Sequence, residues 1–282
     1  MTVSRATPGG EQYLALQRQA RREGRPLDEL GTLYALEGFL ARLAESPERD
    51  SFVLKGGVLL AAYETRRPTR DADLLALALD NDRDVVEAKV RAIATRERAD
   101  GLVFLDGSVV AEVIRDEDEY AGIRVKLTYL LARMELRIGV DVNVGDPVYP
   151  APQEIALPGL LDGEVRLLGS PMVSVIAEKA VTAMQRGEAN TRWRDFADIV
   201  LLARRHELDP VEIGDACATI ARHRHADLLP IADLTATYPA VAQSRWAAWR
   251  RRQALTDELP EQFADVLAEV AALIDATTAP HR

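Results

Sequence analysis

The sequence predicts an α+β protein in which a mixed sheet with flanking helices precedes a helical half. Residues 109–144 contain three segments rich in β-branched residues, separated by turn or acidic residues. Residues 27–43 and the region after residue 170 carry apolar residues at helical spacing. The 282 residues are 48% apolar and 28% charged, which suits a globular chain with a sizeable core. We place a mixed α/β half over 1–158 and a helical half over 159–282.

The first part of the chain predicts helices around a strand–turn–helix segment. Apolar residues at helical spacing define the first two helices, and two glycines end the first short strand. The expected elements are a helix over 12–22, a helix over 27–43, a strand over 51–54, a helix over 58–63, a strand over 71–77 and a helix over 85–98.

The rest of the chain predicts strands and then helices. The expected strands are 109–115, 122–131 and 134–144, the last with clean polar–apolar alternation. Prolines at four positions between 147 and 158 indicate a long irregular connection. Ser170 and Pro171 resemble an N-cap followed by a proline at the first helical position. They would begin a helix to about Arg186, with a break at 187–190, a helix over 191–205 and about three more helices to residue 274.

Composition excludes several classes of protein. The single Cys217 rules out a disulfide framework and a cysteine zinc site. The first residues contain no apolar signal region and no segment approaches membrane-spanning length, so we expect a cytoplasmic protein without a membrane partner. The net charge of −10 argues against a protein that coats nucleic acid through bulk electrostatics, but it allows a local basic groove.

Asp71 and Asp73 are the first candidates for chemistry. Residues i and i+2 of a strand point to the same side, so both carboxylates would face one spot. Carboxylate oxygens hold Mg²⁺, usually together with substrate phosphates. Gly56 and Gly57 would let the backbone approach a ligand, and at a helix start they would favour phosphate. This order of glycines, helix and D-x-D strand indicates nucleotidyl transfer; the alternative is an ordinary turn and an edge strand with solvated aspartates.

The segments Gly56-Gly57-Val58-Leu59-Leu60, Arg66 to Arg70 and Asp71-Ala72-Asp73 resemble the AbiEii-type nucleotidyltransferases, including their MenT branch. These are toxins of bacterial toxin–antitoxin pairs. The resemblance implies a polymerase-β-type core, with a third carboxylate on a strand beside the D-x-D strand. Asp141, on the polar face of 134–144, fits that position better than Asp146, which lies in a Gly-Asp-Pro turn. It would help hold the metal or accept a proton from the attacking hydroxyl; the alternative is a solvated strand aspartate.

The resemblance continues in the second half with Glu178-Lys179 and Arg194-Asp195. It implies that Lys179 contacts the nucleotide phosphates and that Asp195 orients Lys179 or the acceptor. Asp198, one turn later on the same helix, is the alternative to Asp195. The other interpretation is a surface lysine and an aspartate that stabilises a helix start.

Three further segments carry expectations. Gly56 and Gly57 would admit the phosphates, while Arg66 and Arg70 would offset their charge. Thr69 matches a position that is phosphorylated in part of the MenT branch, where added charge would repel a triphosphate; a plain turn threonine is the alternative. Residues 246–252 combine two tryptophans with three arginines, which would either contact RNA or pack against the protein.

The resemblance covers residues 51–205 and implies a toxin that depends on Mg²⁺ or Mn²⁺. It would add nucleotides from a nucleoside triphosphate (NTP) to RNA, with the tRNA 3′ end as the best documented acceptor, and so block translation. A cognate antitoxin protein would be its partner. One alternative is a small-molecule, antibiotic-type nucleotidyltransferase, because the net charge of −10 suits a cationic acceptor. The other is a non-catalytic nucleotide-binding protein, against which the intact Asp71, Asp73, Lys179 and Asp195 argue.

Overall fold

The computed structural model describes residues 3–115, 121–145, 147–187, 192–234, 237–253 and 255–281. The chain divides into two compact units, each assembled from several segments. The first unit comprises Met1–Ala62, Arg66–Gly145 and Gln153–Gly169, and the second comprises Tyr63–Thr65, Asp146–Pro152 and Ser170–Arg282. Within the described ranges, every strand belongs to the first unit and the second unit is helical, which confirms the predicted α+β class.

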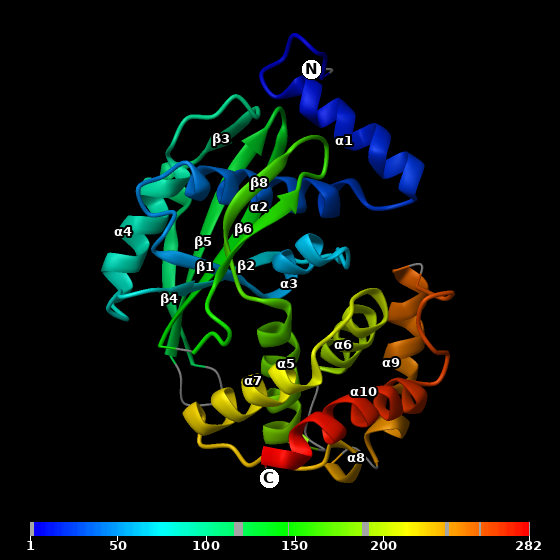
Figure 1. Cartoon of the computed structure of the whole chain (residues 1–282). Helices are drawn as coiled ribbons and strands as arrows, with labels where there is room; N and C mark the ends of the chain where they lie inside the picture. The colour runs from blue at the N-terminus through cyan, green and yellow to red at the C-terminus, as the bar shows by residue number, and fades with distance from the viewer. Residues whose placement is uncertain are drawn as a thin grey trace. The chain divides into compact units, whose positions relative to one another are not determined.

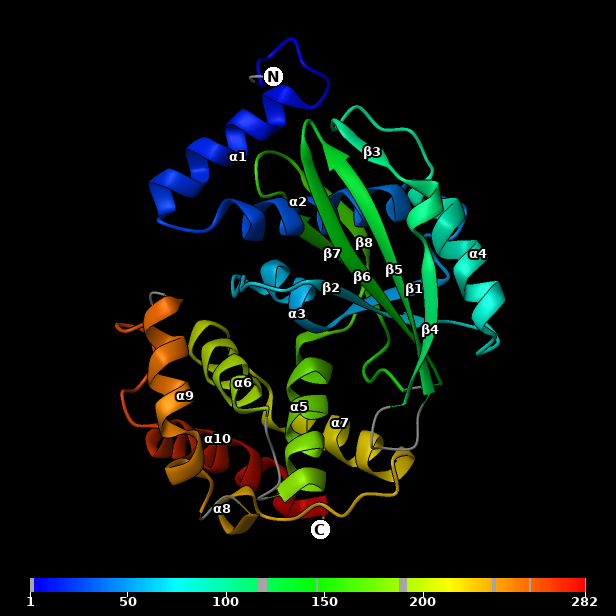
Figure 2. The same cartoon turned by 180° about the vertical axis from the view of Figure 1, so that it is seen from behind.

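The first unit is built on a mixed sheet of eight described strands (Figures 1 and 2). These strands are β1 (Phe52–Lys55), β2 (Asp71–Ala76), β3 (Leu102–Phe104), β4 (Val110–Arg115), β5 (Ala121–Leu131), β6 (Met134–Val144), β7 (Gln153–Pro158) and β8 (Glu164–Gly169). Their order is β3-β5-β6-β2-β1-β8-β7, and β4 also pairs with β5. β2 runs antiparallel to β1 and parallel to β6. The D-x-D strand is therefore central in the sheet, which excludes the edge-strand alternative.

The helices of the first unit pack on this sheet and on one another. They are α1 (Gly10–Glu23), α2 (Leu27–Ala44), α3 (Gly56–Leu59) and α4 (Arg83–Ala94), with 3₁₀ turns at Leu60–Tyr63 and Asp106–Ser108. Leucines at helical spacing bury much of α2 (Leu30, Leu33, Leu36 and Leu40 are 0–3% exposed). α2 contacts β6 and β8, and α4 contacts α2, β4 and β5. In both views α2 runs across the strands.

Some expectations for this part of the chain were wrong. Of the expected irregular connection over 147–158, residues 147–152 are irregular, but residues 153–158 form β7, which pairs antiparallel with the unpredicted strand β8 and buries Ile155 and Leu157. Pro158 ends β7 at the edge of the sheet, where proline is tolerated. The short strand β3 was not predicted, and α4 ends at Ala94, four residues earlier than expected.

The second unit consists of helices around an aromatic core. They are α5 (Met172–Arg186), α6 (Trp193–Arg205), α7 (Pro210–His223), α8 (Ile231–Leu234), α9 (Tyr238–Arg252) and α10 (Phe263–Thr278), followed by a 3₁₀ turn at Ala279–His281. Phe196, Trp246 and Phe263 are almost completely buried between α6, α9 and α10. Among the residues that the structure describes, no helix is long and apolar enough to cross a membrane.

The helix starts of the second unit differ from the predicted ones. α5 has Pro171 at its N-cap and no side-chain cap, so Ser170 does not cap it as expected. The expected break at 187–190 and the start of the next helix at Thr191 fall mainly on residues 188–191, which lie outside the described residues, as does Asp146. α7 has a side-chain cap at Asp209, whose carboxylate accepts a hydrogen bond from the Val211 backbone N–H at 2.8 Å.

Candidate active site

Asp71, Asp73 and Asp141 form a carboxylate cluster on two neighbouring strands of the first unit. β2 and β6 pair in parallel with Asp71 opposite Gly139 and Asp73 opposite Asp141. Residues in register on neighbouring strands share a face, as do residues two apart on one strand. The sheet therefore brings together the three aspartates that the sequence singled out. Asp141 is 8% exposed, which excludes the interpretation of a solvated strand aspartate.

Glycines make room for these carboxylates. Gly56 begins α3 with φ +64°, and a Cβ atom there would lie 1.8 Å from Asp73 Oδ2. The Gly57 backbone N–H donates a hydrogen bond to the Asp73 carboxylate. Across the sheet, a Cβ on Gly139 would lie 2.2 Å from Asp71 Oδ1. A side chain at Gly56 or Gly139 would collide with an aspartate oxygen, so the positions of the aspartates themselves require glycine there. The sequence suggested only that the glycines let the backbone approach a phosphate.

The cluster carries negative charge that the surrounding protein only partly neutralises. Burial, followed by repulsion from Asp141, raises the pKa of Asp73, and the Gly57 N–H lowers it in part. Burial and Asp141 also raise the pKa of Asp71, which Arg124 and Arg70 partly counteract. Carboxylates whose charged forms are destabilised in this way gain from a bound cation.

Arg124 is the residue of this site that sequence reasoning missed. It lies on β5 directly opposite Asp141. Its Nε donates to Asp141 Oδ1 at 2.7 Å and its Nη2 donates to Asp141 Oδ2 at 2.5 Å. The same Nη2 lies 3.9 Å from Asp71 Oδ2. This bidentate pair favours the charged form of Arg124 and raises its pKa.

The donor chemistry of Asp71 and Asp73 fits a hard divalent cation, because both offer carboxylate oxygens on one face of β2. Arg124 engages both oxygens of Asp141, the third carboxylate. Within the described part of the chain, no group of three or more His, Cys, Asp or Glu side chains is arranged to hold a metal ion. A metal role for Asp141 therefore stays a prediction.

The segment before β2 contains side chains with different partners. Arg66 forms an ion pair with the buried Glu37 and donates to the Pro158 carbonyl, so its guanidinium already has partners within the first unit. Arg70 is exposed and acts electrostatically on Asp71. The Thr69 hydroxyl donates to the Asp71 backbone carbonyl at 3.2 Å. Nucleotide binding by Arg66 and Arg70 and phosphorylation of Thr69 stay predictions.

A second charged group, here called the lysine cluster, lies in the second unit and consists of Lys179, Asp195, Asp198 and Arg192. Lys179 Nζ donates to Asp195 Oδ1 at 2.7 Å and to Asp198 Oδ2 at 2.8 Å. Arg192 Nε donates to the other oxygen of Asp195 at 2.7 Å. Lys179 is 9% exposed, so the surface-lysine interpretation is wrong. Asp195 and Asp198 are both partners of Lys179, so the choice between them as the site residue stays a prediction.

The tryptophans of α9 belong to the core of the second unit. Trp246 is completely buried and Trp249 is 5% exposed. Their rings contact Trp193 at centroid distances of 6.2 and 5.2 Å. Arg250 Nε donates to the Leu259 carbonyl at 2.8 Å. Packing, the alternative to stacking on RNA bases, is therefore confirmed for both tryptophans.

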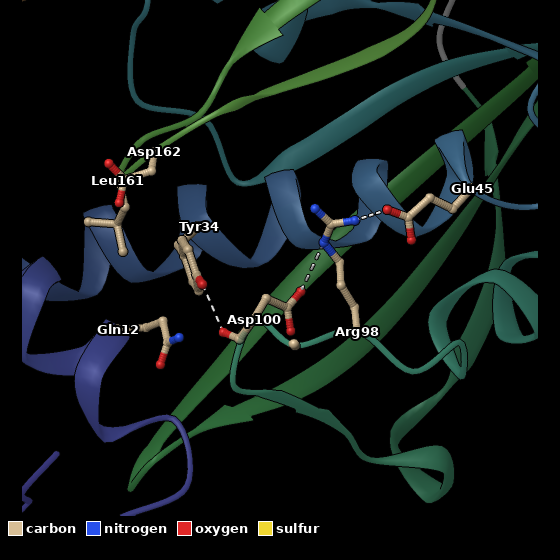
Figure 3. Close-up of a pocket in the computed structure, with 8 residues that line it drawn as sticks. Gln12, Tyr34, Glu45, Arg98, Asp100, Leu161 and Asp162 are labelled. Carbon is tan, nitrogen blue, oxygen red and sulfur yellow. Dashed lines mark hydrogen bonds and ion pairs between the residues drawn. The ribbon is translucent and has the colours of Figure 1, made fainter. Parts of the chain in front are cut away.

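A pocket of about 510 Å³ lies elsewhere in the first unit (Figure 3). Its polar groups contact one another: the Tyr34 hydroxyl donates to the Asp100 carbonyl at 2.8 Å, and Arg98 forms ion pairs with Asp100 and Glu45. The residues that line it are Gln12, Tyr34, Glu45, Arg98, Ala99, Asp100, Leu161 and Asp162. This pocket contains no member of the carboxylate cluster.

Comparison with known proteins identifies the family. Two solved structures from Helicobacter pylori, JHP933 and a nucleotidyltransferase, are each 14% identical in sequence to this chain, with a TM-score of 0.49. The match to JHP933 covers 87% of this chain and 90% of JHP933. The match to the nucleotidyltransferase covers 89% of this chain and 95% of that protein. An antigenic nucleotidyltransferase-like protein from Paracoccidioides brasiliensis is 18% identical with a TM-score of 0.40, covering 70% of this chain and 89% of its own. Among curated proteins, none matches. Residues 38–269 match the family described as nucleotidyl transferase AbiEii toxin, type IV TA system, and since this is most of the sequence, the chain belongs to that family.

Proposed function

We propose that this chain is a toxin that transfers nucleotides from an NTP to RNA, at the tRNA 3′ end, with a divalent cation as cofactor. The observation that carries the proposal is the carboxylate cluster, in which Asp73 and Asp141 lie in register on adjacent parallel strands. The raised pKa values of Asp71 and Asp73 support a cation there. Membership of the AbiEii family supports nucleotidyl transfer and an antitoxin partner.

Each residue of the carboxylate cluster has a proposed task. Asp71 and Asp73 would hold Mg²⁺ or Mn²⁺ through their oxygens. When bound, such an ion orients the triphosphate and offsets the charge that develops on the leaving pyrophosphate. An RNA hydroxyl oxygen forms a bond to the α-phosphorus as the bond to pyrophosphate breaks, and Asp141 would accept the hydroxyl proton. Gly56 and Gly57 keep Asp73 in place for this chemistry.

Cationic side chains would bind the triphosphate. Arg70 is exposed beside Asp71, which suits contact with an entering phosphate. The family resemblance supports phosphate contact by Lys179 and an orienting role for Asp195, and the 2.7 Å ion pair between them gives the ammonium a defined position. Phosphorylation of Thr69 would place added negative charge beside Asp71 and repel the triphosphate.

The test incubates the protein with total tRNA, Mg²⁺ and each of four α-³²P-labelled NTPs. Asp71→Asn is compared with Asp80→Asn, which changes an exposed aspartate outside the cluster. We expect labelled tRNA with the native protein and with Asp80→Asn. Transfer by Asp71→Asn should fall at least about a hundredfold because the cation loses a ligand. Absence of label with all four NTPs in folded protein would rule out tRNA as the acceptor.

A small-molecule acceptor is the second candidate, favoured by the net charge of −10, which attracts cationic compounds. The same assay with an aminoglycoside in place of tRNA distinguishes the two. Label on the aminoglycoside alone would replace the RNA proposal, and label on tRNA alone would exclude the small-molecule candidate.

A further inference from the structure

Arg124 lies beside two members of the carboxylate cluster, Asp141 and Asp71. Its guanidinium engages both oxygens of Asp141, at 2.7 and 2.5 Å. The nitrogen that contacts Asp141 Oδ2 is also 3.9 Å from Asp71 Oδ2. Arg124 is thus directed at the space between the carboxylates of β2 and β6.

A guanidinium nitrogen and a metal ion cannot share this space. Mg²⁺ takes its oxygen ligands at about 2.1 Å in near-octahedral geometry. A cation held by Asp71 and Asp141 together would therefore contact the same oxygens as Arg124 Nη2, and the two positive charges would repel each other. The fork-like geometry of the arginine matches a carboxylate well, so its departure from the largely buried Asp141 has a real cost.

We propose that Arg124 is a positioning residue that acts as a built-in counter-ion of Asp141 and competes with the divalent cation for this carboxylate. Arg124 neutralises Asp141 through the bidentate contact between β5 and β6. Metal binding by the full set of carboxylates requires the guanidinium to leave Asp141. This inference rests on the proposed function, because it assumes a cation at the cluster.

Lys126 provides a matched control for the charge. It lies two residues after Arg124 on β5 and therefore on the same face. Its ammonium forms an ion pair with Glu112 at 2.6 Å, and its side chain is 54% exposed. Its effect on Asp71 is electrostatic and lowers the pKa of that carboxyl. Removing Lys126 takes away one positive charge near the cluster and leaves the contact with Asp141 intact.

The experiment titrates nucleotide-free protein with Mn²⁺ and follows the electron paramagnetic resonance signal of the free ion. Native protein, Arg124→Gln, Lys126→Gln and Asp71→Asn are compared. We expect Arg124→Gln to bind Mn²⁺ at least about tenfold more tightly, because a competing charge-assisted hydrogen bond is gone. Lys126→Gln should change the affinity by no more than about twofold, since an exposed charge is screened. Asp71→Asn should bind more weakly.

Equal affinities of Arg124→Gln and Lys126→Gln, or weaker binding by Arg124→Gln, would overturn the inference. Circular dichroism checks that each variant folds. If Arg124→Gln does not fold, Arg124→Lys replaces it. The Mn²⁺ affinity of Arg124→Lys must still exceed that of the native protein, because an ammonium cannot make the bidentate contact. The two proposals fail separately. If the native protein transfers nucleotides to RNA but the Arg124 variants bind Mn²⁺ as the native protein does, only the proposed competition is overturned. If Asp71→Asn binds Mn²⁺ as well as the native protein and no nucleotidyl transfer is detected, both proposals are overturned.

Discussion

The carboxylate of Asp73 occupies the space that a Cβ atom on Gly56 would need, with 1.8 Å between that Cβ position and Asp73 Oδ2. Gly139 stands in the same relation to Asp71, at 2.2 Å. Each aspartate of the D-x-D strand is therefore seated against a glycine of another element. A side chain at either glycine would displace the very oxygens that the proposed chemistry uses.

Gly56→Ala should destabilise the protein by more than its backbone conformation alone explains. Alanine at a left-handed φ costs about 1–2 kcal/mol, and the collision with Asp73 should add about 1–3 kcal/mol. Gly163→Ala is the control, because Gly163 has φ +74° and nothing within 4 Å of its Cβ position. Urea unfolding measures both variants, and equal losses of stability would show that Asp73 does not create the strain.

Asp73→Asn should stabilise the metal-free protein at neutral pH. The pKa of Asp73 is raised in the folded state, so its contribution to stability is present below its unfolded value near 3.8 and is lost as pH rises through the folded value. Asparagine does not ionise and so removes this loss of stability. The difference in the free energy of unfolding between Asp73→Asn and the native protein should therefore shrink as pH falls. Urea midpoints between pH 4 and 8, in the presence of a chelator, follow the difference.

Asp141→Asn should act in the opposite direction to Asp73→Asn. It removes the partner of Arg124 and should cost about 1.5–3 kcal/mol, the range for hydrogen bonds to charged groups. A loss of stability on Asp73→Asn at pH 7 comparable to that of Asp141→Asn would contradict the electrostatic difference between the two aspartates.

Lys179→Met should destabilise the second unit as well as remove any contact with phosphate. It leaves Asp195 and Asp198 buried without the ammonium between them, and breaking such a pair costs about 3–5 kcal/mol. The exposed pair of Lys126 with Glu112 is the comparison, and Lys126→Met should cost at most about 1 kcal/mol. Chemical unfolding measures both. Native stability of Lys179→Met would show that the lysine cluster contributes nothing to the fold.

Trp246→Ala should destabilise the protein by about 3–5 kcal/mol, because the indole is completely buried against Phe263. Arg251→Ala, on the exposed side of the same helix, should stay within about 0.5 kcal/mol of the native protein. Thermal unfolding compares the two. Native stability of Trp246→Ala together with weaker tRNA binding would instead support the rejected stacking role.

Strong periodicity made most of the fold predictable, and competing signals hid the rest. Alternation in 134–144 predicted β6 to the residue, and leucines at helical spacing predicted α2. The hairpin of β7 and β8 was not predicted, because the prolines between residues 147 and 158 favoured an irregular connection. The alternation of Ile155 and Leu157 with exposed neighbours is nevertheless typical of a strand. β3 has only three residues, too few for a periodic signal.

The aspartates of the site were predicted from the sequence, but the partner of Asp141 was not. Asp71 and Asp73 follow from the two-residue period of a strand. The contact of Arg124 with Asp141 depends on the register of β5 and β6, which the two-residue turn at Ala132 and Arg133 sets. That turn places Ala132 at φ +53° and lacks the Asn-Gly type of sequence that would have revealed it. The expected strands 122–131 and 134–144 leave the same two residues between them, so the Arg124–Asp141 contact follows from the sequence once these strands are paired as a hairpin.

The composite make-up of the second unit has a consequence for expressing parts of this protein. Tyr63–Thr65 belongs to that unit although it lies far from the rest in sequence. The Tyr63 hydroxyl donates to the Ser170 carbonyl at 2.6 Å, and its ring meets His206 edge-on. A fragment that begins at residue 170 would lose both contacts. A circular permutant that opens an exposed surface loop keeps every segment on one chain and is the sounder route to dissecting the two units.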